Sequence, residues 1–327
     1  MKKMSNKVFI PVVYGVALAF GLLSMLAPND YFYSAAYTVL LFIILSSAWN
    51  ILGGYTGYVN FGTAAFFAMG AYTTVAIFKL APGTPLIVMI IAGMLIAGLT
   101  GLGMGALTLR LRGVFFSIAT LALSVVMFTF VVNWDYVGGA RGAYVIAPRD
   151  APLGFKRYIY FLYAVMIFLS ATAMIVARII ETSTIGRGLE AIRDDELAAE
   201  CCGVPTLRLK LLSTTISGAL MGMAGTTYPY FVSYVEPAST FNLSYAVNSI
   251  AMPLIGGMTT WVGPLIGAVL LGTVQQVVQV TISSAWNLLI VGVLLVLFVT
   301  LAPEGIMGLW YDFRKKQRMK KEKGGAQ

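Results

Sequence analysis

Charged residues are missing from seven long stretches of this 327-residue chain. A helix that crosses a bilayer needs about 20 consecutive apolar residues, and each stretch is long enough for at least one. Only 11% of the residues are charged and 59% are hydrophobic, so the composition excludes a soluble enzyme. We therefore predict an all-α polytopic membrane protein. The stretches are 8–29, 31–78, 80–109, 113–134, 158–177, 211–235 and 237–303.

Two of these stretches are too long for a single crossing. Residues 31–78 divide at the glycine-rich segment 53–57, and residues 237–303 divide at 256–264 and again near Ser283. Eight spans are an alternative, in which the short segment 244–257 belongs to a re-entrant pair. The main prediction is about ten spans, near residues 8–27, 33–52, 60–78, 85–109, 114–133, 158–177, 211–231, 244–257, 264–281 and 286–302.

The distribution of Lys and Arg predicts the orientation of these spans. With both termini in the cytoplasm, seventeen of the twenty-two basic residues lie inside, as the positive-inside rule requires. The loop 178–210 is then cytoplasmic and the loop 134–157 is external. Spans two to five begin outside and spans seven to ten begin inside, which is the arrangement of an inverted repeat. Residues 1–310 form one predicted transmembrane domain, and the basic tail 311–327 is expected to contact membrane lipid, not nucleic acid.

Several kinds of chemistry are absent from the sequence. The chain has no histidine, and its two cysteines, Cys201 and Cys202, are adjacent, so we expect no metal site and no enzymatic activity. No Gly-Lys pair is present, hence no phosphate-binding loop of the usual kind. The interiors of the predicted spans contain no ionisable residue, which disfavours a proton-driven carrier or a voltage-gated channel. If transport is active, its energy enters from another chain.

The cytoplasmic loop 178–210 is predicted to contain a short helix. Residues 188–202 are rich in helix formers, and Gly203 followed by Pro205 is a helix stop. Arg193 is three residues from both Glu190 and Glu196, within reach of either on a helix surface. The small side chains of Ala191, Ala198 and Ala199 leave a flat face on which another protein can dock. A solvated connecting helix is the alternative.

Residues 186–204, GRGLEAIRDDELAAECCGV, closely resemble the coupling loop of permeases from branched-chain amino-acid ABC importers, the LivM-like family. Three other segments resemble the same family: residues 54–72, residues 111–122, and 255–257 together with 263–268. The resemblance implies that this loop seats in a groove of an ATPase subunit. The implied coupling residues are Gly186, Arg187, Glu190, Ala191, Arg193, Asp194, Glu196, Ala198, Ala199 and Gly203.

The family resemblance also implies a place and partners. It implies a permease in the bacterial cytoplasmic membrane that carries a branched-chain amino acid or a related neutral solute. A second permease subunit, ATPase subunits that hold ATP and Mg, and a periplasmic or lipid-anchored binding protein are the expected partners, and no cofactor is expected in this chain. One departure concerns the substrate: the family usually has Ser-x-Gly-His-Ala where this chain has residues 60–64, with Thr63 in place of the histidine.

Polar residues and glycines interrupt the apolar run at residues 53–63. Non-helical backbone at membrane depth must be buried in protein or line a cavity. We therefore expect the translocation path or its cytoplasmic gate here, although for any single Ser or Thr an interhelical hydrogen bond is the alternative. The predicted path residues are Asn50, Tyr55, Thr56, Gly57, Asn60, Thr63 and Thr120. Other polar side chains within the apolar runs include Asn248, Gln275, Gln276 and Gln279.

Two questions stay open at this point. Gly93, Ala97, Gly101 and Gly105 recur every four positions, which is typical of a close-packing stripe, either within the chain or against a second permease subunit. An importer permease is the main functional hypothesis. A sodium-coupled secondary carrier, with ions held at broken-helix carbonyls, and a non-transporting membrane scaffold are the alternatives.

Overall fold

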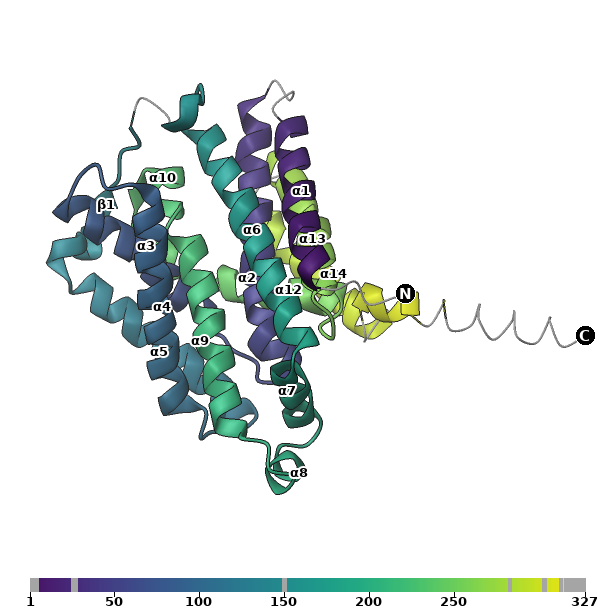
Figure 1. The fold of residues 1–327 in the computed structure, drawn as a ribbon. Helices are drawn as coiled ribbons and strands as arrows, with labels where there is room; N and C mark the ends of the chain where they lie inside the picture. Colours follow the sequence, from purple (N-terminus) through teal and green to yellow (C-terminus); the bar gives the residue numbers. More distant parts are fainter. Residues whose placement is uncertain are drawn as a thin grey trace, which may run out of the picture.

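The structure, a computed structural model, describes residues 6–24, 29–148, 152–281, 284–301 and 305–311, together with Arg314. Within these residues the long helices form one bundle (Figure 1). They are α1 (Asn6–Ser24), α2 (Asp30–Thr56), α3 (Thr63–Leu80), α4 (Leu86–Thr108), α5 (Val114–Val132), α6 (Tyr158–Thr182), α9 (Thr206–Gly225), α12 (Leu243–Gly256), α13 (Val262–Thr281) and α14 (Ser284–Leu301).

Short elements connect the long helices at the two ends of the bundle. At one end, α7 (Thr184–Asp194) and α8 (Glu196–Cys201) follow α6 (Figure 1). The other end carries η1 (Asp135–Val137), η2 (Gly139–Arg141), η3 (Pro152–Gly154), α10 (Tyr228–Val232) and α11 (Pro237–Thr240). There β1 (Ala143–Tyr144) pairs antiparallel with β2 (Tyr234–Val235), Ala143 opposite Val235. We call the first the coupling end and the second the distal end.

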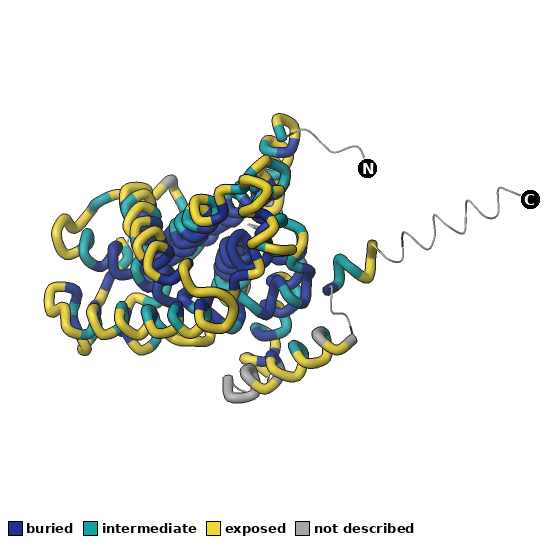
Figure 2. Tube along the Cα trace, turned by 90° about the horizontal axis from the view of Figure 1, so that it is seen from below, coloured by how far each residue is buried: buried dark blue, intermediate teal, exposed yellow. Residues whose placement is uncertain are grey.

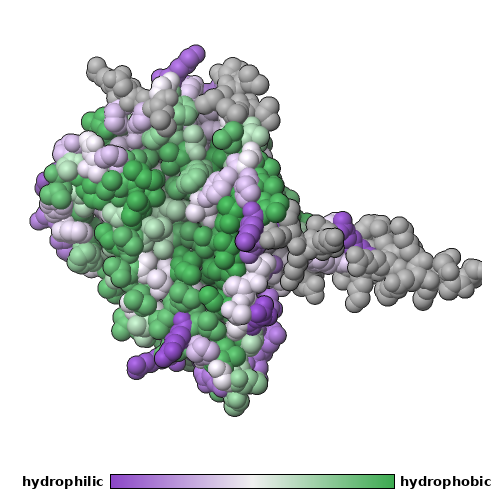
Figure 3. Space-filling model, in the orientation of Figure 1, coloured by the Kyte–Doolittle hydropathy of each residue, from purple (hydrophilic) through white to green (hydrophobic). Residues whose placement is uncertain are grey.

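Among the described residues, six helices are long and apolar enough to cross a membrane: α2, α3, α4, α5, α6 and α13. Hydrophobic residues form a broad band across the visible face, with hydrophilic residues toward both ends (Figure 3). The prediction of an all-α polytopic membrane protein is therefore confirmed. A helix overlaps each of the ten predicted spans, but α12 has only 14 residues, or about 21 Å of length at 1.5 Å per residue. The number of complete crossings stays a prediction.

Helix α2 lies at the centre of the bundle. Every residue from Leu40 to Thr56 is buried, and α6, α9, α12 and α13 pack around this helix. Figure 2 shows buried residues gathered in the middle and exposed residues along the outer sides. A helix that is apolar on all sides belongs in such a position.

The small-residue stripe of α4 packs against α9 of the same chain. Ala97 is fully buried, and a Cβ atom added to Gly222 would lie 2.1 Å from the Cβ atom of Ala97. One added to Gly101 would lie 2.8 Å from the carbonyl oxygen of Thr214, and one added to Gly93 2.1 Å from Thr226. Backbones approach this closely only where both helices carry small residues. The stripe is thus an internal seam, which answers the question that the sequence left open.

The helix boundaries differ from the predicted ones in two places near the coupling end. Gly53 and Gly54 belong to α2, and the chain leaves the helix only at Gly57, whose φ of 76° is in the left-handed region. The break is therefore 57–62, not 53–57. Helices α6 and α9 also extend beyond the predicted spans, so Arg178, Glu181 and Lys210 lie on them.

The predicted single helix at 188–202 is divided into α7 and α8. Asp195 has an extended backbone, with φ −159° and ψ 110°, and its carboxylate accepts hydrogen bonds from the N–H groups of Leu197 and Ala198. Aspartate is a favourable N-cap, and a second helix therefore begins where the sequence pattern favours continuation. The predicted tail 311–327 lies outside the described residues except for Tyr311 and Arg314, and the guanidinium of Arg314 lies 3.8 Å from the ring centroid of Trp310.

We predict that Gly222→Ala destabilises the protein. The added methyl group has no space beside Ala97, and overpacking of this kind costs on the order of 1–3 kcal/mol. Thermal denaturation in detergent measures the effect. Gly103→Ala on α4 is the matched control, because a Cβ there meets nothing within 4 Å and alanine is the better helix former. Equal melting temperatures for the two variants would contradict the seam.

Candidate functional site

The break between α2 and α3 is partly buried non-helical backbone: Tyr58, Asn60 and Gly62 are buried, whereas Gly57 and Val59 are exposed. The indole Nε1 of Trp49 donates a hydrogen bond to the carbonyl oxygen of Asn60, 2.8 Å away. The side-chain oxygen of Asn60 accepts a hydrogen bond of 2.7 Å from the N–H of Gly62. Two backbone groups that a helix would otherwise satisfy thus find partners within the segment 49–62.

Hydroxyl groups of α5 satisfy further backbone groups of the break. Thr120 Oγ1 accepts a hydrogen bond of 3.1 Å from the N–H of Phe61. Ser117 Oγ donates one of 2.8 Å to the carbonyl oxygen of Val59. Non-helical backbone at membrane depth needs this kind of support. The structure brings Thr120, predicted from sequence as a path residue, to the break in this supporting position.

The structure brings the other predicted path residues together around the same break. Asn50, Tyr55, Thr56, Asn60, Thr63 and Thr120 are all buried, and Gly57 is exposed. Three buried polar atoms here have no hydrogen-bond partner: Oδ1 of Asn50, Nδ2 of Asn60 and Oγ1 of Thr63. The residues are packed in protein, so their role as a path or gate stays a prediction.

Helix α7 lies directly beneath the end of α2. Its buried Leu189 and Ile192 anchor it to the bundle, and Ser183 caps it by accepting a hydrogen bond from the N–H of Gly186. Nη1 of Arg193 donates a hydrogen bond of 3.3 Å to the carbonyl oxygen of Gly54, in the last turn of α2. The predicted pairing of Arg193 with Glu190 or Glu196 is not formed; its ion pair is with Asp194, at 3.7 Å.

The predicted coupling residues divide into two groups. Those on the surface can meet a partner subunit, and those that face the bundle can only act within the chain. Arg187, Asp194, Ala198 and Gly203 are exposed, Gly186 and Ala199 are buried, and Glu190, Ala191, Arg193 and Glu196 are half-buried. Of the three alanines predicted to form a flat face, Ala198 is exposed, Ala191 is half-buried and Ala199 is buried, and the docking face stays a prediction.

Glu196 of α8 forms a buried ion pair that the sequence analysis did not find. Its Oε1 atom lies 2.7 Å from Nζ of Lys210, whose side chain is only 2% exposed. Lys210 Nζ also donates hydrogen bonds of 3.2 Å to the Tyr58 hydroxyl and to the carbonyl oxygen of Leu109. Arg112 lies 3.7 Å from the same carboxylate. This group, which we call the Lys210 cluster, joins α8, α9, the break and the α4–α5 turn.

The protonation of Glu196 follows from these contacts. Burial opposes ionisation, but hydrogen bonds from Lys210 and Tyr58 and the charges of Lys210 and Arg112 prevail and hold the pKa of Glu196 below its usual value. The ion pair therefore contributes its full stabilisation of the fold at pH values above the usual carboxyl pKa. This contribution is lost as the pH falls through the lowered value.

A second charged group lies at the same end. Oε2 of Glu181 accepts hydrogen bonds from the N–H of Trp261, at 2.6 Å, and from the Tyr55 hydroxyl, at 3.4 Å. The guanidinium of Arg178 lies 3.6 Å from the ring centroid of Phe9. Glu181 thus joins α2 and α6 to the α12–α13 turn. In the sequence, both groups are visible only as charged residues near the end of an uncharged run. Such a position does not identify the residues that each charge contacts.

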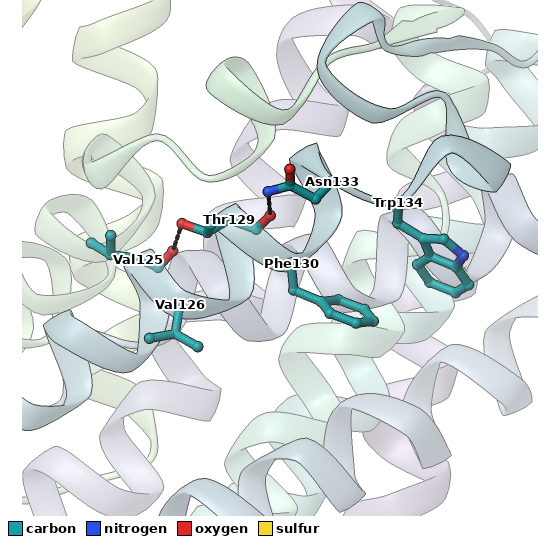
Figure 4. A pocket seen from close by; sticks show the side chains of 6 residues that line it. All are labelled: Val125, Val126, Thr129, Phe130, Asn133 and Trp134. Carbon is teal, nitrogen blue, oxygen red and sulfur yellow. Dashed lines mark hydrogen bonds between the residues drawn. The ribbon is translucent and has the colours of Figure 1, made fainter.

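A hollow on the outer face of α5 is not part of this site. About 590 Å³ in volume, it is lined by six residues, including Val125, Phe130 and Trp134 (Figure 4). Two of its polar side chains bond to the backbone of α5: Thr129 donates a hydrogen bond to the carbonyl of Val125, and Asn133 donates one to the carbonyl of Thr129. What remains is an apolar surface of the kind that faces lipid.

Comparison with known proteins identifies the class of molecule to which this arrangement belongs. A family model described as "Branched-chain amino acid transport system / permease component" matches residues 31–299. The chain therefore belongs to this family of permease components, and the LivM-like resemblance is confirmed. No solved structure matches the chain.

Individual relatives agree with the family. The chain is 26% identical to the high-affinity branched-chain amino acid transport system permease protein LivM of Salmonella typhimurium, over 92% of this chain and 75% of the relative. It is 28% identical to LivM of Escherichia coli, over 82% and 68%. A probable branched-chain amino acid transport permease protein LivH of Methanocaldococcus jannaschii is 25% identical, over 81% and 87%. These relatives are transport components, and they give no support to a carrier driven by sodium or to a scaffold.

We predict that Lys210→Met destabilises the protein by on the order of 2–3 kcal/mol, because it removes the buried cation of the pair and leaves the Glu196 carboxylate only the more distant Arg112. The double variant Lys210→Met, Glu196→Leu should recover most of this loss. Melting temperatures of the single and double variants in detergent give the coupling energy.

The pair of Arg157 and Asp30 at the distal end is the matched control. Its side chains are 61% and 48% exposed, so Arg157→Met should cost less than about 1 kcal/mol. Similar losses at both pairs, or additive effects in the double variant, would rule out a buried stabilising pair at Lys210.

Proposed function

We propose that the chain is the membrane-spanning permease subunit of an ATP-driven importer for branched-chain amino acids or related small neutral solutes. It lies in the bacterial cytoplasmic membrane, with both termini and the coupling end in the cytoplasm. The family match over residues 31–299 carries this proposal. The relatives' substrate supports the choice of solute.

The contacts of α7 and α8 support a coupling role for the segment 186–203. An ATPase that moves this segment also pulls on Gly54 through Arg193, and on the break and α9 through the Lys210 cluster. The exposed Arg187, Asp194 and Ala198 are the residues that such a partner can reach. The segment is thus both accessible from outside the bundle and attached to the predicted gate.

The remaining parts of the transporter follow from this role. ATP and Mg bind to separate ATPase subunits, a second permease subunit completes the membrane domain, and a periplasmic or lipid-anchored binding protein delivers the solute to the distal end. The cytoplasmic gate is formed by the predicted path residues, which are Asn50, Tyr55, Thr56, Gly57, Asn60, Thr63 and Thr120. In this proposal the gate is closed in the present conformation, since these side chains are packed.

The packing supports an inverted repeat within the proposed permease. If α2, α3, α4 and α5 are equivalent to α9, α12, α13 and α14, each contact in one half should have a counterpart in the other. The contacts of α9 with α3 and α4 correspond to those of α2 with α12 and α13. Those among α3, α4 and α5 correspond to those among α12, α13 and α14. The break 57–62 then has its counterpart at the distal end, in residues 226–242.

Transport by the reconstituted complex tests the proposed function. We expect proteoliposomes that contain this chain, its partner permease, the ATPase subunits and the binding protein to accumulate radiolabelled leucine when ATP is supplied at the coupling end. A sodium gradient should have no effect. Uptake that follows the sodium gradient and ignores ATP would replace the proposal with a secondary carrier.

Substitution of the exposed alanine of α8 tests the coupling segment. We expect Ala198→Trp to reduce leucine uptake at least about tenfold, because a bulky side chain does not fit a close-packed seat, while the subunit still folds. Co-purification of the ATPase and ATP hydrolysis per leucine carried measure docking and coupling. Ala106→Trp, at an exposed position on α4, is the control. Normal uptake by the Ala198 variant would make the segment a simple connector.

A further inference from the structure

A cavity of about 550 Å³ lies at the distal half of the bundle. Side chains of α2, α10, α12 and α13 line it, and Ser239 of α11 also contributes. Its residues on α2 lie between Tyr31 and Phe42, in the half of the helix away from α7. Exposed residues at its edge, such as Tyr31 and Gln279, place its mouth at the distal end. None of the predicted path residues of 50–63 belongs to its lining.

Two buried amides form the polar wall of the cavity. Nε2 of Gln275, on α13, donates a hydrogen bond of 2.8 Å to Oδ1 of Asn248, on α12. The side chains of both residues are held in place, with Gln275 4% and Asn248 9% exposed. This bond uses one donor group and one acceptor, so the amino group of Asn248 and the carbonyl of Gln275 can bind a solute. If both amides were turned around, one donor group and one acceptor would still remain.

Aromatic rings form another part of the lining. Tyr37 and Phe231 are stacked, with ring centroids 4.0 Å apart and 12° between their planes. The hydroxyl of Tyr37 is already bonded to Thr227 at 2.7 Å, so this residue offers the cavity its ring and not its polar group. The ring of Tyr245 lies against Phe42 and Tyr228. Apolar groups of a solute can pack on these faces.

The described residues that line the cavity include no Asp, Glu, Lys or Arg. A site without fixed charge does not hold an ion tightly, whereas a molecule that carries both charges, or neither, needs only dipoles and hydrogen bonds. An amide N–H₂ suits a carboxylate, and an amide carbonyl suits an ammonium group. The combination of one donor, one acceptor and an aromatic wall fits a zwitterionic amino acid with an apolar side chain.

The position of the cavity fits a conformation in which a solute enters from the distal end. Below Phe42, α2 is buried on all sides as far as Thr56. In this segment the turn between α12 and α13 packs against α2, and Nδ2 of Asn50 donates a hydrogen bond of 3.4 Å to the carbonyl of Thr260. A Cβ added to Gly54 would lie 2.7 Å from the carbonyl oxygen of Met258. The cavity is therefore open toward the distal end and closed toward the coupling end.

We propose that this cavity is the site at which the permease itself binds the solute in transit, with the free amide groups of Asn248 and Gln275 on its charged groups and the rings of Tyr37, Phe231 and Tyr245 around its side chain. The inference rests on the proposed function and extends it. The permease then selects against charged side chains, in addition to any selection by the binding protein.

Substitutions in the polar wall test this site. In the reconstituted complex, with a saturating concentration of leucine-loaded binding protein, we expect Gln275→Met and Asn248→Leu each to lower the rate of leucine uptake at least tenfold. Co-purification of the ATPase subunits with each variant checks that the complex still assembles. Asn133→Leu, which removes an exposed amide at the distal end of α5, is the matched control and should transport normally.

A second variant separates a binding defect from a folding defect. Thr38→Cys places a thiol in the cavity lining, in a background where Cys201 and Cys202 are replaced by Ser. We expect a small membrane-impermeant thiol reagent, added from the binding-protein side after assembly, to abolish uptake by this variant and to leave Asn133→Cys in the same background active. Because modification follows folding, its effect reports only on occupation of the cavity.

The outcomes distinguish this proposal from the proposed function. Leucine transport by the wild-type complex, together with normal uptake by both amide variants and by modified Thr38→Cys, would overturn the cavity and leave the importer assignment intact. A wild-type complex that hydrolyses ATP but accumulates no leucine would overturn both. Loss of uptake in all three variants, with the controls active, is the result we expect.

Discussion

The requirement that non-helical backbone find hydrogen-bond partners governs the break between α2 and α3. Helix α2 ends at Thr56, and residues 57–62 are not helical. The N–H of Gly57 still bonds to the carbonyl oxygen of Gly53, but groups further along the break need other partners. Trp49 from within α2 and the hydroxyls of Ser117 and Thr120 from α5 supply what is missing. The break can exist only while these elements stay together, so any movement of α5 or α2 also changes the break.

The same constraint explains where the charges are. Glu196 with Lys210, and Glu181 with the backbone of Trp261, are placed where several elements meet at the coupling end. Each half-buried carboxylate is held by partners on a different element, and its partial desolvation is offset only while those elements remain in contact. These groups therefore tie α8, α9, the break and the α12–α13 turn into one assembly. In the proposed importer, this assembly is what the ATPase moves.

The sequence predicts most of the helices and little of their pairing. Uncharged runs and glycine clusters can be recognised from local composition. The sequence therefore predicts a helix near Thr63 and a break before it. The position of the break was missed by four residues, because Gly53 and Gly54 serve packing and only Gly57 needs a positive φ. The partner of Lys210 and the cavity beside Gln275 depend on residues far apart in the chain. A single sequence contains no signal that pairs them.

The two ends of the molecule differ in chemistry, and the proposed inverted repeat gives this difference a meaning. Under that repeat, the break 57–62 and the segment 226–242 occupy equivalent positions at opposite ends, and alternating access requires one to be open when the other is closed. The distal end contains a cavity lined by uncharged polar groups. At the coupling end, buried polar atoms of Asn60 and Thr63, beside the break, have no hydrogen-bond partner among the described residues. Such atoms are costly in a permanently closed site. We infer that they gain their partners, water or the solute, when ATPase-driven movement of α7 and α8 opens this end and closes the other.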